Sequence, residues 1–306
     1  MTQSPANGAK SWAILVPIKE LHLAKTRLLP PKGVDRADLA LAMALDVITA
    51  SLSASRVNRV IAITNDQRAR NAVNGLGADI VDDDPDAGLN PALEHAQAHA
   101  RSLGSVRVAA VSSDLAALTG AALDVVLGHI NEDSRAFIRD ASGEGTALLA
   151  AAGVPLHPNF GPDSAAAHAR SGAIDLTDAA LDLVSTSRAG LRRDVDTIAD
   201  LLDAQEIGVG HHTSAILASA ILAEVSMRSH VSGGARVSEL SHAGQATVRT
   251  WDETTGALTA VRDDGTLLEI GPEAFLSSPL LRLRPGQRIR LESRNGVIVR
   301  VSLPTM

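Results

Sequence analysis

Short apolar runs that break into polar residues and lead into helical patterns recur through the first half of the chain. The clearest, residues 106–111, is bounded by a glycine and a charge and ends at Ser112–Asp114. Its length and β-branched content predict a strand buried on both faces of a parallel sheet. Ligands of open α/β sheets bind beyond the carboxyl ends of the strands, where Asp114 could hold a divalent cation. Alternatively, Asp114 is the N-cap of the Leu/Ala-rich segment that follows.

The same alternation fills the chain around this stretch. Strands are predicted at 12–16, 57–64 and 78–81, and helices at 35–52, at about 67–75, from residue 90 or 91, and near 120–130. Strands that alternate with helices indicate a mostly parallel, doubly wound sheet.

The pattern changes after residue 134. Two apolar runs within residues 135–151, joined by the sequence SGEGT, predict a hairpin whose glycine-rich turn is open to anions. Residues 160–173 predict an Ala-rich helix whose N-terminus, behind Gly161, is a second anion site. Residues 191–208 predict a short strand ending in Asp194–Val195–Asp196, and then a helix capped by Thr197.

The C-terminal part has a different composition. Residues 211–244 predict a helix over 214–227 and a Gly/Ser-rich linker, and residues 245–306 are short β-rich runs with regular turns. These runs indicate a small all-β barrel of the OB type, and the module resembles a cold-shock domain. We therefore expect three parts: an α/β domain over 11–210, a helix and linker over 211–244, and the barrel over 245–306.

Composition narrows the function. The 306-residue chain has no Cys, which excludes disulfides and Cys nucleophiles, and its net charge of -7 argues against nucleic acid as a partner. The barrel also lacks the aromatic surface that holds single strands, with only Trp251 near the expected position. No apolar run has the length of a signal segment or a membrane span, so we expect a cytoplasmic protein.

The charged groups point to phosphate chemistry. Residues 17–33, a loop directly after the first strand, carry Lys19, Lys25 and Arg27. Such a loop is where phosphates bind in this class of sheet, although a simple solvated loop would have the same composition. Together with Asp114 and with Asp194 or Asp196, it would suit a Mg²⁺–nucleotide complex and nucleotidyl transfer.

Several segments resemble one family in order and spacing, over about residues 11–210. The segments are VPIKELHLAKTRLLP, GLNPALEHA, VSSDLAALT, GEGT, FGPDSAAAHARSGA and GLRRDVDT. They resemble the 2-phospho-L-lactate guanylyltransferases, which include members that use phosphoenolpyruvate. The resemblance implies a Rossmann-like, GT-A-like nucleotidyltransferase sheet. It also implies transfer of GMP from GTP to phosphoenolpyruvate or 2-phospho-L-lactate, with release of pyrophosphate, on the route to a deazaflavin redox coenzyme.

The resemblance also implies residue roles. Lys25 would face the GTP phosphates, with Lys19 and Arg27 in the same loop, and Gly88 and Asn90 would bind the nucleotide. Asp114 and Asp196 would hold Mg²⁺, with Asp194 as the alternative to Asp196. The acid would be bound by Thr146, Gly161 and Ser164. One departure is Ala116, where the family usually has proline, and this should alter a turn rather than a ligand.

Other functions stay open at this point. The chain could be a nucleotidyltransferase for another acceptor, such as a sugar phosphate or molybdopterin, or an OB-type nucleic-acid-binding protein. An Ala-, Val- and Arg-rich composition favours a high-GC bacterium and hence phosphoenolpyruvate, although the residues do not separate the two acids. The sequence leaves the oligomeric state open.

Overall fold

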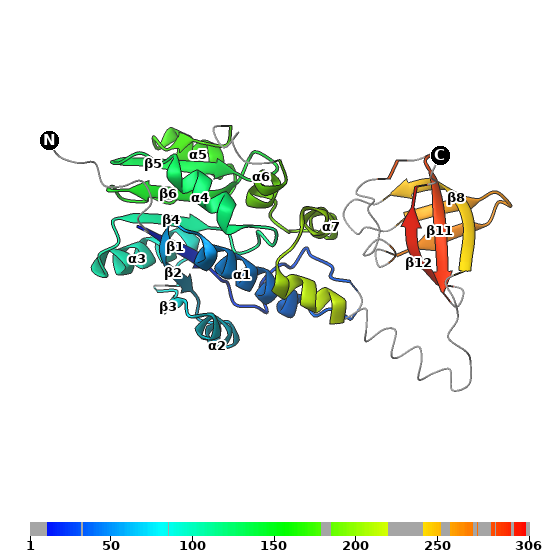
Figure 1. The fold of residues 1–306 in the computed structure, drawn as a ribbon, viewed down its shortest axis with the longest axis horizontal. Helices are drawn as coiled ribbons and strands as arrows, with labels where there is room; N and C mark the ends of the chain where they lie inside the picture. The colour runs from blue at the N-terminus through cyan, green and yellow to red at the C-terminus, as the bar shows by residue number, and fades with distance from the viewer. Residues whose placement is uncertain are drawn as a thin grey trace. The chain divides into compact units, whose positions relative to one another are not determined.

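The first strand of the chain lies inside a seven-stranded sheet (Figure 1). The computed structural model describes residues 11–31, 33–84, 86–178, 185–219, 241–251, 258–271, 274, 283–284, 286–294 and 297–303. The chain forms two units. The first is Met1–Lys25, Ala37–Asp194 and Ile207–Thr213, and the second is Thr26–Arg36, Val195–Glu206 and Ser214–Met306.

The sheet of the first unit is mostly parallel, as predicted. Its strand order is β3-β2-β1-β4-β6-β5-β7. The parallel part contains β1 (Trp12–Pro17), β2 (Val57–Ile63), β3 (Asp79–Val81) and β4 (Arg107–Val111). The predicted hairpin is β5 (Ser134–Arg139) and β6 (Thr146–Ala152), and β6 also runs antiparallel to β4.

Helices cover both faces of this sheet because its strands are apolar on both sides. In β1, Trp12, Ile14 and Val16 enter one buried cluster, and Ala13 and Leu15 enter the other. Buried residues of α1 (Arg36–Ser53), α2 (Gln67–Leu76) and α4 (Gly120–Gly128) belong to the first cluster. Those of α3 (Leu89–Ser102) and α5 (Ser164–Arg170) belong to the second. The result is a three-layer doubly wound architecture.

Three details around the seven-stranded sheet differ from the sequence-based expectation. The segment before Asp194 is a helix, α6 (Ser185–Arg192), and no strand precedes the acidic pair. Leu191 of this helix is fully buried in a core cluster. The apolar residue that suggested a buried strand before Asp194 therefore packs from a helix. The N-cap alternative for Asp114 is also wrong, because α4 is capped by Thr119, whose hydroxyl accepts from Ala122 N–H at 3.2 Å. The third is an added strand, β7 (Ile174–Asp175), beside β5.

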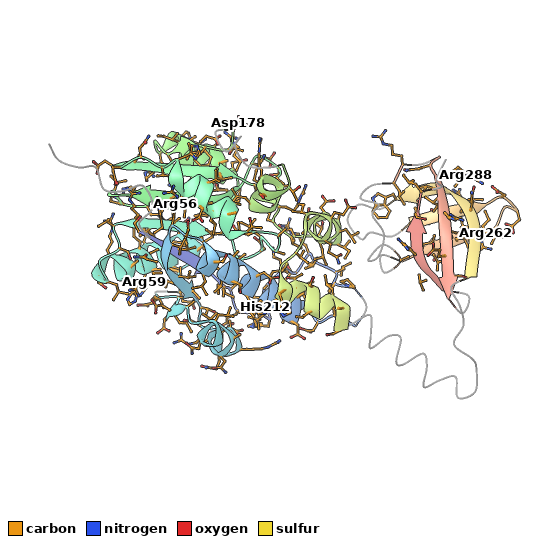
Figure 2. All side chains as sticks on the ribbon, viewed as in Figure 1. Arg56, Arg59, Asp178, His212, Arg262 and Arg288 are labelled. Atoms are coloured by element: carbon orange, nitrogen blue, oxygen red, sulfur yellow. The ribbon has the colours of Figure 1, made fainter. Side chains whose placement is uncertain are left out.

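The second unit contains the predicted small all-β module. Its five antiparallel strands have the order β10-β9-β8-β11-β12. They are β8 (Ser241–Trp251), β9 (Leu258–Arg262), β10 (Leu267–Ile270), β11 (Arg288–Arg294) and β12 (Val297–Ser302). Arg288, labelled in Figure 2, forms an ion pair with Asp263 on this sheet (Nη2–Oδ2 2.9 Å).

The segment predicted as helix and linker is partly described. Residues 211–219 are helical, three residues earlier than the predicted start at Ser214, and residues 220–240 lie outside the described residues. Strand β8 begins at Ser241, inside the predicted linker. Before it, α7 (Ile198–Ile207) begins with the predicted cap. Asp200 accepts from Thr197 N–H at 2.9 Å, and Asp200 N–H donates back to the Thr197 hydroxyl at 3.3 Å.

None of the helices in the described part of the chain combines the length and the apolar character that crossing a membrane requires.

Candidate active site

The basic loop after β1 meets the carboxyl end of β4. Lys25 of this loop forms an ion pair with Asp114, and both side chains are largely buried, at 12% and 21% exposure. Strands β1 and β4 are parallel neighbours, paired through Leu15 and Ala110. The chain passes from β1 to β2 on one side and returns to β4 on the other, so the pair lies at the switch point of the sheet, where α/β proteins bind ligands.

Both members of this pair carry signs of a functional role. Lys25 has a left-handed backbone conformation (φ 54°), which is strained for a residue with a side chain. Asp114 Oδ1 is buried and has no hydrogen-bond partner. A buried carboxylate oxygen without a donor is costly unless a cation or another donor completes it. The donor chemistry of Asp114 therefore fits a hard divalent cation.

A second carboxylate holds the loop in place. Asp66 accepts from Leu21 N–H of the basic loop at 3.0 Å, and it caps α2 through Arg68 N–H at 2.9 Å and Ala69 N–H at 3.0 Å. Burial raises the pKa of Asp66, but these backbone hydrogen bonds outweigh it and lower the pKa below its usual value. The charged form of Asp66 thus fixes the start of the loop that carries Lys25.

The acidic segment before α7 is divided between the two units. Asp196 forms an ion pair with Arg27 within the second unit, and its backbone N–H donates to Asp200 at 3.2 Å. Asp194 belongs to the first unit, and Lys19 is exposed. Among the described residues, no three His, Asp or Glu side chains are grouped to hold a metal by themselves. The roles of Asp194 and Asp196 stay predictions.

The residues predicted to bind the acid converge in the first unit. Ser164 Oγ, in the first turn of α5, lies 3.3 Å from Thr146 Oγ1 at the start of β6, and both side chains are buried. Ala165 N–H donates to Glu144 O at 3.0 Å, which joins the glycine-rich turn to α5. Gly161 is exposed just before this helix, with φ 144°. The structure therefore brings the two predicted anion segments together.

A histidine that the sequence reading missed completes this cluster. His168 is fully buried, its Nδ1 lies 2.9 Å from Thr146 Oγ1, and its Nε2 accepts from Asn159 N–H at 2.9 Å. Burial, and then the charge of Arg135, lower the pKa of His168 to about 4, so the ring is neutral. Its position four residues after Ser164 on a helix was the signal that could have revealed it.

The predicted nucleotide segment is tied to the acid segment. Asn90, near the start of α3, donates from Nδ2 to Phe160 O at 3.0 Å and accepts from Phe160 N–H at 2.8 Å through Oδ1. Gly88 is the N-cap of α3, with φ 104°, a conformation that favours glycine. Asn90 therefore has a structural contact that the sequence did not predict, and its contact with a nucleotide stays a prediction.

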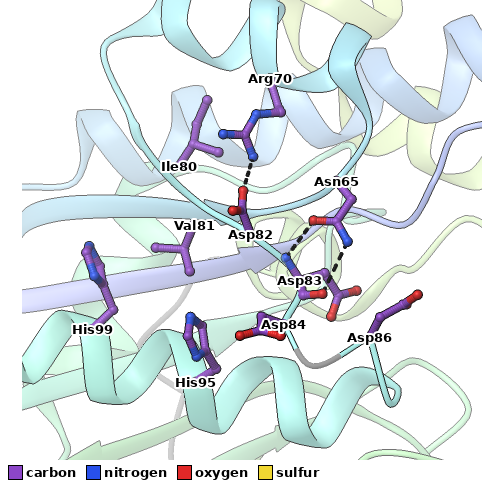
Figure 3. Close-up of a pocket in the computed structure, with 10 residues that line it drawn as sticks. All are labelled: Asn65, Arg70, Ile80, Val81, Asp82, Asp83, Asp84, Asp86, His95 and His99. Carbon is purple, nitrogen blue, oxygen red and sulfur yellow. Dashed lines mark hydrogen bonds and ion pairs between the residues drawn. The ribbon is translucent and has the colours of Figure 1, made fainter.

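An acidic hollow lies beside this segment (Figure 3). Its volume is about 670 Å³, and four aspartates and two histidines dominate its lining. Arg70 forms an ion pair with Asp82, and Asp83 N–H donates to Asn65 Oδ1 at 3.0 Å. Burial, and then the Asp86 carboxylate, raise the pKa of Asp83. A wall of carboxylates repels phosphate but accepts hydrogen bonds from N–H groups.

The sequence matches one family model and is similar to several known proteins. The family model described as "Guanylyl transferase CofC like" matches residues 12–237. A phosphoenolpyruvate guanylyltransferase of Geodermatophilus obscurus is 46% identical over an alignment of 217 residues, which covers 69% of this chain and 96% of that protein. One of Frankia casuarinae is 45% identical over an alignment of 237 residues, which covers 70% of this chain and 78% of that protein.

Among solved structures, a nucleotidyl transferase from Methanothermobacter thermautotroptrophicus is similar at 19% identity and a TM-score of 0.42, over 64% of this chain and 96% of that chain.

Proposed function

We propose that this chain, which belongs to the CofC-like guanylyl transferase family, transfers GMP from GTP to phosphoenolpyruvate. The family relatives named above carry that activity in their names. The observation that supports the proposal most directly is the Lys25–Asp114 pair at the switch point of the sheet. A phosphate oxygen of the acid forms a bond to the α-phosphorus of GTP, the α–β bridging bond breaks, and pyrophosphate leaves.

We propose different electrostatic roles for Lys25 and Asp114. The Lys25 ammonium is largely buried, and we propose that it faces the phosphates of GTP and offsets their negative charge. Asp114 supplies the oxygen that lacks a partner, and we propose that it holds Mg²⁺. When bound there, the ion would supply positive charge that stabilises the negative charge of the phosphates. Asp196, or alternatively Asp194, is proposed as a second metal ligand. Arg27 and Lys19 extend the positive charge of the loop.

The acid is proposed to bind at Thr146, Gly161 and Ser164. Two hydroxyls 3.3 Å apart and an exposed glycine backbone suit a small anion with a phosphate and a carboxylate. The Glu144–Ala165 contact holds this subsite together, and the Asn90–Phe160 contact connects it to the nucleotide segment.

We propose that the acidic hollow reads the guanine base. Guanine presents N1–H and an amino group on one edge, whereas adenine presents an acceptor at N1. Carboxylates such as Asp84 can accept from both the N1–H and the amino group of guanine, whereas N1 of adenine would meet them without a hydrogen to donate. Asp84→Asn should therefore reduce the preference for GTP over ATP by roughly tenfold, because it introduces a donor beside the N1–H group. An unchanged preference would place the base elsewhere.

The test of the reaction uses the full chain with GTP, Mg²⁺ and one acid at a time, following pyrophosphate release. We expect release with phosphoenolpyruvate and not with a sugar phosphate. Release that depends on 2-phospho-L-lactate and not on phosphoenolpyruvate would reassign the acceptor. Absence of release with every acid, in a folded protein that binds GTP, would contradict the proposed function.

A further inference from the structure

The ring of His168 has its two nitrogens fixed by different partners. Asn159 N–H donates to Nε2 at 2.9 Å, so Nε2 carries a lone pair and the single proton of the neutral ring lies on Nδ1. Nδ1–H then donates to Thr146 Oγ1, 2.9 Å away. This proton position is inferred from Asn159 N–H, because a backbone N–H can only donate a hydrogen bond and never accept one. The ring itself is held between Phe137 and Phe160, at centroid distances of 6.0 and 5.0 Å.

The tautomer decides what the hydroxyl pair can offer to a ligand. Thr146 and Ser164 have two hydroxyl protons between them, and the contact of 3.3 Å between their oxygens uses one. Because Nδ1–H already donates to Thr146, neither hydroxyl proton is needed for a hydrogen bond to the ring. The second hydroxyl proton can therefore be donated to an oxygen outside the pair. With the proton on Nε2 instead, Ser164 would donate to Thr146 and Thr146 to Nδ1, and no proton would remain.

We propose that His168 is a positioning residue of the acceptor subsite, which holds the Thr146–Ser164 hydroxyl pair as a hydrogen-bond donor toward an anionic oxygen of the acid. This inference rests on the proposed function. His168 and Ser164 lie one turn apart on α5, so the helix fixes their spacing. Burial of the ring keeps it from taking a second proton, which would remove the acceptor of Asn159 N–H.

The experiment compares two substitutions with a matched control in the full chain. His168→Leu removes the donor to Thr146, and His168→Asn can place an amide N–H near the position of Nδ1. His157→Asn is the control, because His157 is exposed in the preceding loop and its φ of 47° is one that asparagine accepts. The readouts are the separate KM values for phosphoenolpyruvate and GTP, the melting temperature, and the ¹⁵N shifts of the His168 ring.

We expect His168→Leu to raise KM for phosphoenolpyruvate about tenfold or more, while KM for GTP changes less than about twofold. His168→Asn should recover most of this loss, and His157→Asn should match the parent protein. In the parent, the ring should show Nδ1–H and an unprotonated Nε2 from pH 5.5 to 8.

Two results would overturn the positioning role. One is an Nε2–H tautomer in the parent protein. The other is a folded His168→Leu protein whose KM values for phosphoenolpyruvate and GTP rise equally or not at all. The tautomer is measured without substrate. A parent protein that has Nδ1–H but releases no pyrophosphate with any acid would therefore contradict the proposed reaction, and not the arrangement of the hydroxyls.

Discussion

Asn90 and Phe160, 70 residues apart in the sequence, are joined by two hydrogen bonds that use both ends of the Asn90 amide. The contact links the start of α3 to the segment that leads into α5. A nucleotide contact and an acid contact would thus share one support.

Asn90→Ala tests this shared support. The change leaves Phe160 N–H and C=O without their partners, and we expect the free energy of unfolding to fall by about 1–3 kcal/mol. The KM values for GTP and for the acid should both rise. Steady-state kinetics with each substrate varied in turn check this, and a rise confined to GTP would show that the contact with Phe160 does not support the acid subsite.

Asp114→Asn tests the carboxylate at the end of β4. The amide is nearly isosteric but neutral, so it neither pairs with Lys25 as a charge nor balances a divalent cation. We expect kcat to fall about a hundredfold or more while the protein stays folded. Pyrophosphate release titrated with Mg²⁺ gives the measurement.

Asp196→Asn and Asp194→Asn, compared side by side with Asp114→Asn, identify the second ligand. The second metal ligand is the residue whose substitution also raises the Mg²⁺ concentration needed for half-maximal rate. Near-normal turnover in Asp114→Asn would exclude that residue from the metal site.

Two helical glycines give a matched pair for stability. A Cβ on Gly190 of α6 would lie 2.2 Å from the backbone oxygen of Ala117, whereas a Cβ on Gly75 of α2 would meet nothing within 4 Å. We expect Gly190→Ala to destabilise the protein by about 1–3 kcal/mol, because backbone must move. Gly75→Ala should stabilise it by about 0.5–1 kcal/mol through helix propensity. Denaturant unfolding measures both, and equal effects would contradict the close approach of α6 to Ala117.

The buried ring of His168 makes stability depend on pH in a definite direction. Burial, and then Arg135, lower the pKa of His168 in the folded protein from 6.5 to about 4. Between these values the unfolded chain binds more protons than the folded one. The contribution is therefore complete above pH 6.5 and is lost as the pH falls toward 4, by at most about 3 kcal/mol. His168→Asn should have a shallower decline across this window in urea unfolding, and an identical decline would rule out a neutral, protected ring.

The parts of the fold that the sequence predicted are those with a clear period. β1 and β4 are continuous apolar runs because both of their faces are buried, and α1 repeats its apolar positions at helical spacing. β7 has two exposed residues and hence no period to detect. The acidic pair Asp194 and Asp196 has the composition expected after a strand, but Leu191, just before it, packs into the core from a helix.

The candidate site divides in the same way. Lys25 and Asp114 could be placed together because each follows a strand of a parallel sheet, and the structure joins them. His168 was missed because a histidine in the last turn of an Ala-rich helix is also an ordinary capping residue. Its role depends on Asn159 and Thr146, and no local pattern brings these two together.

Leu202 of α7 is 5% exposed and belongs to the same buried cluster as residues of β8, β9 and β11. The helix whose first turn follows Asp196 therefore shares a hydrophobic core with the C-terminal sheet. Such sharing implies thermodynamic linkage. A ligand held by the segment before α7 should raise the melting temperature of the C-terminal sheet. A cavity made in that sheet, as by Ile289→Ala, should weaken binding of that ligand.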